Sequence, residues 1–178
     1  NEDVVAAAEC KLPWDKLDGC NILVTGATGL IGGCIVEILM SRKHNYNVYA
    51  AGRNEKRAMK RFGKYKDEIT FHFLNYDVCS ELHSDVDFHY IIHAASNASP
   101  VFFNNNPVEV MKANIYGVAN LMEYGRVHNM HRFLYVSTGE VYGEGTQTFS
   151  EKDCGYLDSM APRSCYPSSK RAAESLCM

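Results

Sequence analysis

Short apolar runs alternate with amphipathic stretches along most of the chain. Residues 21–24 form an apolar run that ends in Thr25 and Gly26, which is the pattern of a buried strand. Between Gly29 and Arg42 the apolar residues recur with helical spacing, which predicts a helix with one buried face. The same reasoning predicts strands over 47–51, 69–74, 89–94 and 132–136, and helices over 54–62, 107–128 and from 166 onward.

The alternation begins after a polar leader, residues 1–18, and continues through residues 19–178. Strands that are separated by helices form βαβ units with right-handed crossovers, and such units build a parallel sheet. The predicted fold class is therefore α/β, with a doubly wound parallel sheet between two layers of helices. Ligands bind such sheets beyond the carboxyl ends of the strands, so we expect the functional site there.

The composition fits one globular domain and argues against several partners. The chain has 178 residues, 46% of them hydrophobic, and a formal net charge of −3, which excludes a disordered state. No basic block suggests nucleic-acid binding, and no apolar run is long enough to span a membrane. The seven cysteines form no CxxC pair and no Cys/His cluster has metal-ligand spacing. We therefore expect reduced thiols, no metal site and a cytoplasmic location.

A glycine-rich segment, residues 25–32, follows the first predicted strand and opens the first predicted helix. Its glycines are Gly26, Gly29 and Gly32. In this context one glycine makes the sharp turn, one lets the backbone approach phosphates, and one lets the helix pack against the sheet. The helix N-terminus then offers free N–H groups to an anion. The segment predicts a site for the diphosphate of a dinucleotide.

A second candidate lies in the last predicted helix. Tyr166 and Lys170 are four residues apart, so their side chains share one face of that helix. An ammonium group beside a phenol favours the phenolate, which makes Tyr166 a candidate general base near neutral pH.

Together, these motifs resemble those of the extended short-chain dehydrogenase/reductases, in the sugar-nucleotide epimerase/dehydratase group. The resemblance covers most of residues 19–178 and implies a Rossmann-type domain that binds NAD. Asp77 matches the family's adenine-contacting Asp, residues 93–96 match a motif that flanks the cofactor, and Asn114 matches an Asn that supports the active site. The cofactor-binding residues that the resemblance implies are Gly26, Thr28, Gly29, Leu30, Ile31, Gly32, Arg53, Asp77, Val78, Ala94, Ala95, Ser96, Asn114, Tyr166 and Lys170.

The choice between NAD and NADP depends on the end of the second predicted strand. NAD-binding relatives usually carry an acidic residue there, and residues 50–54 contain none. Arg53 instead suits the 2′-phosphate of NADP. The family favours NAD, so we expect NAD and leave NADP open.

The resemblance also implies the chemistry. Residues 137–143 are similar to the family's active-site motif, which gives catalytic roles to Thr138, Glu140, Tyr166 and Lys170. In that scheme Tyr166 removes the proton from the 4-hydroxyl of a nucleotide sugar while hydride leaves C4. Lys170 holds the nicotinamide ribose, and Thr138 hydrogen-bonds the reacting oxygen. The 4-keto sugar then activates C5, and the hydride is returned.

Three reactions branch from the keto sugar, and the residues favour decarboxylation of UDP-glucuronate. Decarboxylases and 4,6-dehydratases commonly carry an acid like Glu140, whereas 4-epimerases often lack it. Dehydratases of dTDP-glucose also use an Asp just before it, where this chain has Gly139. Residues 161–166 and 170–174 are similar to a decarboxylase segment, although residues 167–169 differ from it, and Arg163 is either a substrate-side cation or a loop residue. A 4,6-dehydratase, a 4-epimerase and a non-catalytic NAD(P)-sensing module stay open as alternatives, because a fold does not fix a function.

Members of this family build their sugar specificity largely from a C-terminal domain. Because this chain stops at Met178, inside a predicted helix, we expect it to be the cofactor-binding part of a longer, homodimeric enzyme. The sixth strand expected of the sheet is missing, so one sheet edge should be bare or covered by a partner. We expect the fragment alone to bind its dinucleotide poorly.

Overall fold

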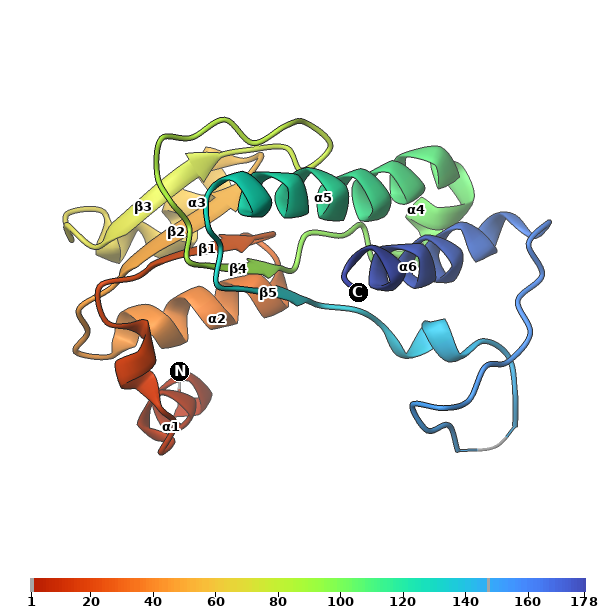
Figure 1. Cartoon of the computed structure of the whole chain (residues 1–178), viewed down its shortest axis with the longest axis horizontal. Coiled ribbons are helices and arrows are strands. Elements are labelled where there is room, and N and C mark those ends of the chain that lie inside the picture. Colours follow the sequence, from red (N-terminus) through yellow and green to blue (C-terminus); the bar gives the residue numbers. More distant parts are fainter. Residues whose placement is uncertain (1, 147) are drawn as a thin grey trace.

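Five parallel strands form the centre of the structure, a computed structural model that describes residues 2–146 and 148–178 (Figure 1). The strands are β1 (Asn21–Thr25), β2 (Asn47–Gly52), β3 (Phe71–Asn75), β4 (Tyr90–His93) and β5 (Arg132–Tyr135). The helices are α1 (Glu2–Glu9), α2 (Leu30–Ser41), α3 (Glu55–Phe62), α4 (Pro100–Asn105), α5 (Pro107–Val127) and α6 (Cys165–Leu176).

The strands lie in the order β3-β2-β1-β4-β5, and each neighbouring pair is parallel. The order reverses beside β1, which is the switch point of a doubly wound sheet. The predicted Rossmann-type fold is confirmed. It places the carboxyl ends of β1 and β4 side by side, because Thr25 pairs with His93 in the register of the two strands.

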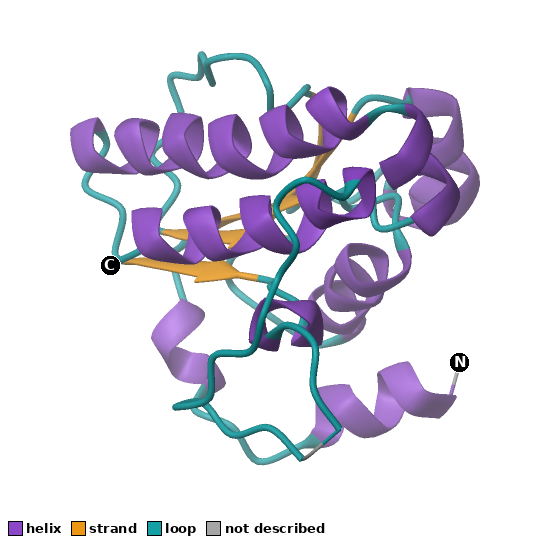
Figure 2. Ribbon diagram, turned by 90° about the vertical axis from the view of Figure 1, so that its right-hand side faces the viewer, coloured by secondary structure: helices purple, strands orange, loops and turns teal. Residues whose placement is uncertain are grey.

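Helices cover both faces of the sheet, and the alternation of residues along β1 decides which layer each side chain meets. Ile22 packs into a core cluster with Val36 of α2 and Phe62 of α3. The next residue, Leu23, points to the opposite face and packs in a second cluster with Leu121 of α5. Figure 2 shows the strands between the two layers, with α6 beside α5. The three-layer arrangement follows from buried strands that are apolar on both faces.

The structure differs from the sequence expectation at three places. The strand predicted over 69–74 is β3, and Ile69 lies outside it with an exposed side chain. The leader contains α1, whose buried Val4 and Ala8 are one helical turn apart and whose helix packs on α2. Helix α4 was not predicted, because six residues are too few for a periodic apolar pattern.

Among the described residues, no helix is both long enough and apolar enough to cross a membrane.

Candidate active site

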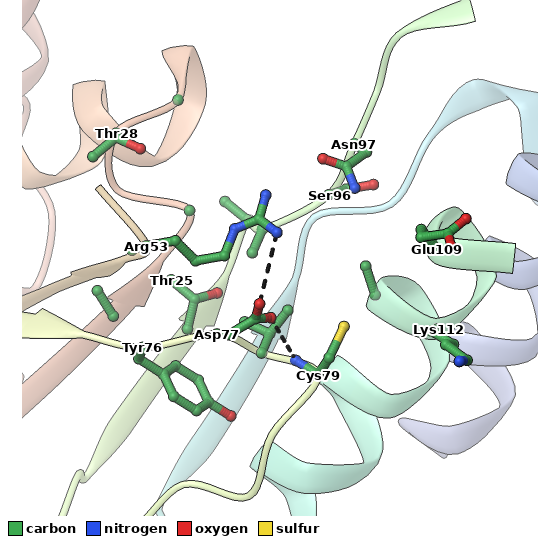
Figure 3. Close-up of a pocket in the computed structure, with 18 of the residues that line it drawn as sticks. Thr25, Thr28, Arg53, Tyr76, Asp77, Cys79, Ser96, Asn97, Glu109 and Lys112 are labelled. Atoms are coloured by element: carbon green, nitrogen blue, oxygen red, sulfur yellow. Dashed lines mark hydrogen bonds and ion pairs between the residues drawn. The ribbon is translucent and has the colours of Figure 1, made fainter. Parts of the chain in front are cut away.

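A pocket of about 450 Å³ opens at the carboxyl ends of β1, β2, β3 and β4 (Figure 3). Its walls come from the turns and loops that follow these strands and from the start of α5. This is the position at which doubly wound sheets bind their ligands. Nine residues that the sequence predicted as cofactor-binding line the pocket, namely Gly26, Thr28, Gly29, Arg53, Asp77, Val78, Ala94, Ala95 and Ser96.

The glycine turn after β1 is built for close backbone contacts. Gly26 has a φ of +66°, and a Cβ on it would lie 2.6 Å from backbone atoms of Ala94 and Ala95. A Cβ on Gly32 would lie 2.6 Å from the carbonyl oxygen of Gly26, so α2 starts directly against the turn. The N–H groups in the first turn of α2 have no acceptors within the helix. The turn therefore presents the free N–H groups of a helix N-terminus, which is the arrangement that binds anions.

Leu30 and Ile31 contribute to this turn through their backbone. Their side chains are 85% and 53% exposed, and neither lines the pocket. Any contact with a bound anion would use the N–H groups of these first helical residues.

Several charged side chains line the pocket (Figure 3). Arg53 lies 3.6 Å from Asp77 in an ion pair, and the second carboxylate oxygen of Asp77 accepts a hydrogen bond from the N–H of Cys79. Arg57 and Lys112 also line the pocket. These two cations were not predicted from the sequence. Arg57 lies in the first turn of the helix predicted right after the second strand, and that position is the signal that could have identified it.

The remaining predicted site residues lie outside the lining of this pocket. They are Gly32, Asn114, Thr138, Glu140, Tyr166 and Lys170. Three of them, Asn114, Tyr166 and Lys170, were expected to bind the cofactor. Since they do not line the pocket, any connection between them and the pocket runs through other residues.

A chain of hydrogen bonds supplies one such link. The hydroxyl of Ser96, which lines the pocket, donates to the side-chain oxygen of Asn114 at 2.8 Å. The amide nitrogen of Asn114 donates to the hydroxyl of Ser169 at 2.9 Å, and that hydroxyl donates to the carbonyl of Tyr166 at 3.0 Å. Asn114 and Ser169 are fully buried. Asn114 therefore connects the pocket to α6, and Ser169 is a member of this connection that sequence reasoning missed.

Tyr166 and Lys170 share one face of α6, as their spacing predicted, and that face is buried. The ring of Tyr166 stacks on Phe103 of α4, with ring centres 4.4 Å apart. Lys170 is 2% exposed, and its ammonium group donates to the carbonyl of Val136 at 2.8 Å. The same ammonium lies 5.8 Å from the centre of the Tyr166 ring. Burial lowers the pKa of Lys170 to about 8, and the nearby carboxylate of Glu174 opposes this shift.

Helix α6 also holds the loop that follows β5. Ser137 donates to the carboxylate of Glu174 at 2.5 Å. The guanidinium of Arg171 donates to the carbonyls of Val141 and Gly155 at 2.6 and 3.0 Å. The sequence gives one signal that Arg171 and Glu174 hold this loop, namely that they follow Lys170 by one and four residues in the same helix.

Thr138 and Glu140 begin a short 3-10 helix in this loop, Gly139–Tyr142. The hydroxyl oxygen of Thr138 accepts a bond from the N–H of Glu140 at 3.3 Å. The carboxylate of Glu140 accepts two hydrogen bonds from Arg163, at 2.7 and 3.2 Å. These bonds raise the pKa of Arg163. The structure thus pairs the predicted acid with the candidate substrate-side cation.

Within residues 2–146 and 148–178, no group of three or more His, Cys, Asp or Glu side chains is arranged to hold a metal ion.

Known proteins share both the sequence pattern and the fold of this chain. The profile of the NAD dependent epimerase/dehydratase family matches residues 22–178. UDP-glucuronic acid decarboxylase 1 of Xenopus tropicalis is 34% identical over 164 residues, which cover 90% of this chain and 37% of that protein. UDP-glucuronic acid decarboxylase 2 of Arabidopsis thaliana is 34% identical over 179 residues, 98% of this chain and 38% of the relative. The chain therefore spans less than half the length of these relatives.

A solved structure gives the same picture of the fold. The dTDP-glucose 4,6-dehydratase of Bacillus anthracis, determined in complex with NAD, matches with a TM-score of 0.70 and 22% identity. The match covers 89% of this chain and 49% of the dehydratase.

Proposed function

The chain belongs to the NAD dependent epimerase/dehydratase family, and from this premise we propose that it is the cofactor-binding part of a nucleotide-sugar-modifying enzyme. The reaction we propose is the decarboxylation of UDP-glucuronate, which makes the enzyme a lyase. The observation that carries the proposal is the junction of α6 with the loop after β5. It brings the helix of Tyr166 and Lys170 together with the segment of Thr138 and Glu140.

In this proposal the chain's own residues bind the sugar, orient it and move one proton. Tyr166 accepts the proton of the sugar 4-hydroxyl, and the hydroxyl of Thr138 holds the same oxygen. The ammonium of Lys170 lies 5.8 Å from the centre of the phenol ring. The nicotinamide ring, when bound, supplies the acceptor and later the donor of hydride. The keto group at C4 accepts the electron pair of the bond between C5 and the carboxylate, so carbon dioxide leaves and an enolate remains. C5 then takes up a proton, and the hydride returned to C4 gives the UDP-pentose.

The choice of decarboxylation rests on the relatives and on two positions of the chain. The similar proteins from Xenopus tropicalis and Arabidopsis thaliana are both named UDP-glucuronic acid decarboxylases. Glu140 supplies an acid in the loop, and Gly139 occupies the position where dTDP-glucose dehydratases use an Asp. A 4,6-dehydratase, or a 4-epimerase of the isomerase class, is the alternative within enzymes. A non-catalytic NAD(P)-sensing module is the alternative outside them.

We propose NAD as the cofactor, in keeping with the family, and residues 19–178 as its binding domain. One observation supports NADP as the second candidate. Arg53 and Arg57 both line the pocket, and the end of β2 offers no carboxylate for ribose hydroxyls. Two guanidinium groups there suit a 2′-phosphate. Titration of the wild-type protein and of Arg53→Met with NAD and with NADP distinguishes the two cofactors. If Arg53 binds the 2′-phosphate, the affinity for NADP should fall in the variant and the affinity for NAD should not.

We further propose that the full-length protein is a homodimer that acts in the cytoplasm. Exposed apolar side chains lie along α5, at Val108, Met111 and Tyr116, and they offer a surface for a second copy. Sedimentation of the full-length protein tests the oligomeric state.

Incubation of the full-length protein with UDP-glucuronate and NAD tests the proposed reaction. We expect carbon dioxide and a UDP-pentose, identified by mass spectrometry. Release of a UDP-hexuronate epimer without carbon dioxide would favour the epimerase, and conversion of dTDP-glucose instead would favour the dehydratase. Absence of any turnover together with intact dinucleotide binding would favour the sensing module.

A further inference from the structure

A guanidinium group from α3 reaches across α2 to the glycine turn. Arg61 donates through Nε to the carboxylate of Glu37 at 2.8 Å and through Nη1 to the carbonyl of Gly29 at 2.6 Å. The Arg61 and Glu37 side chains are 27% and 18% exposed. Gly29 caps the N-terminus of α2 and lines the pocket. The glycine turn is thus bonded to a cation that does not itself line the pocket.

Gly33 makes this crossing possible. A Cβ on Gly33 would lie 1.9 Å from Nη1 of Arg61 and 2.1 Å from its Cζ. Gly33 lies inside α2, where glycine is unfavourable for a helix. Its missing side chain is therefore explained by the space that the guanidinium occupies.

The bond to Gly29 fixes the orientation of one peptide group. The carbonyl of Gly29 accepts both from Arg61 and from the N–H of Gly33, at 2.6 and 3.1 Å. In a planar trans peptide the N–H points opposite to the carbonyl, so the N–H of Leu30 is directed away from the body of α2. A short charge-assisted bond to the carbonyl also polarises the peptide and makes that N–H a stronger donor.

We propose that Arg61 is a positioning residue for the cofactor diphosphate. It holds the peptide between Gly29 and Leu30 so that the N–H of Leu30 faces the anion, and Gly33 is required for it to do so. This inference rests on the proposed dinucleotide site and adds a residue to it that makes no contact with the ligand.

Calorimetric titration of the full-length protein with ADP and with adenosine tests the role. ADP carries the diphosphate, and adenosine lacks it. We expect Arg61→Met to raise the Kd of ADP about tenfold while the Kd of adenosine stays within about twofold of the wild-type value. Lys60→Met, which removes an exposed cation from the adjacent position of α3, should leave both values unchanged.

Gly33→Ala supplies an independent variant, because its methyl group displaces the guanidinium while it improves the helix. We expect weaker ADP binding without a lower melting temperature, a combination that a purely structural role does not produce. The double variant should bind ADP no more weakly than Arg61→Met alone, because both changes remove the same contact.

The outcomes separate this inference from the proposed function. Wild-type protein that binds ADP, with Arg61→Met and Gly33→Ala binding it equally well, would overturn the role of Arg61 and leave the dinucleotide site intact. Wild-type protein that binds no ADP would overturn both. If Arg61→Met fails to fold, Gly33→Ala decides the question.

Discussion

The carboxylate of Glu140 and the guanidinium of Arg163 share two hydrogen bonds, although 23 residues separate them in the chain. The pair joins the short helix after β5 to the segment that leads into α6. Arg–carboxylate pairs of this two-point kind fix geometry as well as charge. The proposed acid of the site is therefore oriented by a residue that lies just before Tyr166 in the sequence.

A double-mutant cycle tests whether the two side chains act as a unit. We expect Glu140→Gln to lower turnover of UDP-glucuronate about a hundredfold, and Arg163→Met about tenfold, because the acid loses its orientation. The double variant should be no slower than Glu140→Gln alone. The rate of carbon dioxide release measures all three. Losses that simply multiply in the double variant would show that the two residues act independently.

Removal of the Tyr166 hydroxyl tests the proposed general base. The ring stacks on Phe103, and phenylalanine preserves that packing. We expect Tyr166→Phe to lower kcat at least about a hundredfold while the variant still binds the dinucleotide. Steady-state kinetics and titration calorimetry measure the two quantities. A variant that keeps the wild-type kcat would show that Tyr166 is not the general base.

Lys170 should make stability depend on pH in a defined window. Burial lowers its pKa from 10.5 to about 8 in the folded protein. Below pH 8 Lys170 is protonated in both the folded and the unfolded chain, so burial of its charge lowers the free energy of unfolding by its full amount. Between pH 8 and 10.5 the unfolded chain holds a proton that the folded protein has released, so the free energy of unfolding rises with pH. This contribution is absent in Lys170→Met.

The difference between wild-type and Lys170→Met protein isolates this effect, because other titrating groups cancel. Urea denaturation at several pH values should show the wild type gaining about 3 kcal/mol relative to the variant from pH 8 to 10.5. Lys60→Met, with its exposed cation, should show a constant difference from wild type. A constant difference for Lys170→Met would contradict the lowered pKa.

The glycine turn should tolerate no side chain at Gly26. Its φ of +66° is unfavourable for a residue with a side chain, and an added Cβ would lie 2.6 Å from backbone atoms of Ala94. We expect Gly26→Ala to cost about 3 kcal/mol of unfolding free energy or more. Gly63→Ala is the matched control, since Gly63 has a helical φ of −56° and nothing lies within 4 Å of an added Cβ. Equal stability of the two variants would refute the close approach.

The sequence determined the architecture because local patterns report burial. The apolar runs and the glycine spacing identified all five strands and the turn. The predicted helix over 54–62 is α3, and Asn54 caps it by accepting a bond from the N–H of Arg57. Strand ends were less certain, since Ile69 is apolar and yet exposed.

The contacts that orient the site were not predictable in the same way. Arg61 meets Gly29 from 32 positions away, and Arg163 meets Glu140 from 23. A charged residue in a helix or loop has the same local pattern whether it faces solvent or crosses to another element. Such partners are fixed by the packing of α2 against α3 and of α6 against the loop after β5, which a single sequence does not express.

The number of carbon dioxide molecules released per bound dinucleotide tests the central claim most directly. Hydride that leaves C4 is returned in the proposed reaction, so the cofactor is not consumed. We expect the full-length protein to release many carbon dioxide molecules from UDP-glucuronate for each dinucleotide, with no net reduction of the cofactor. Release of no carbon dioxide, or of one molecule for each cofactor reduced, would contradict it.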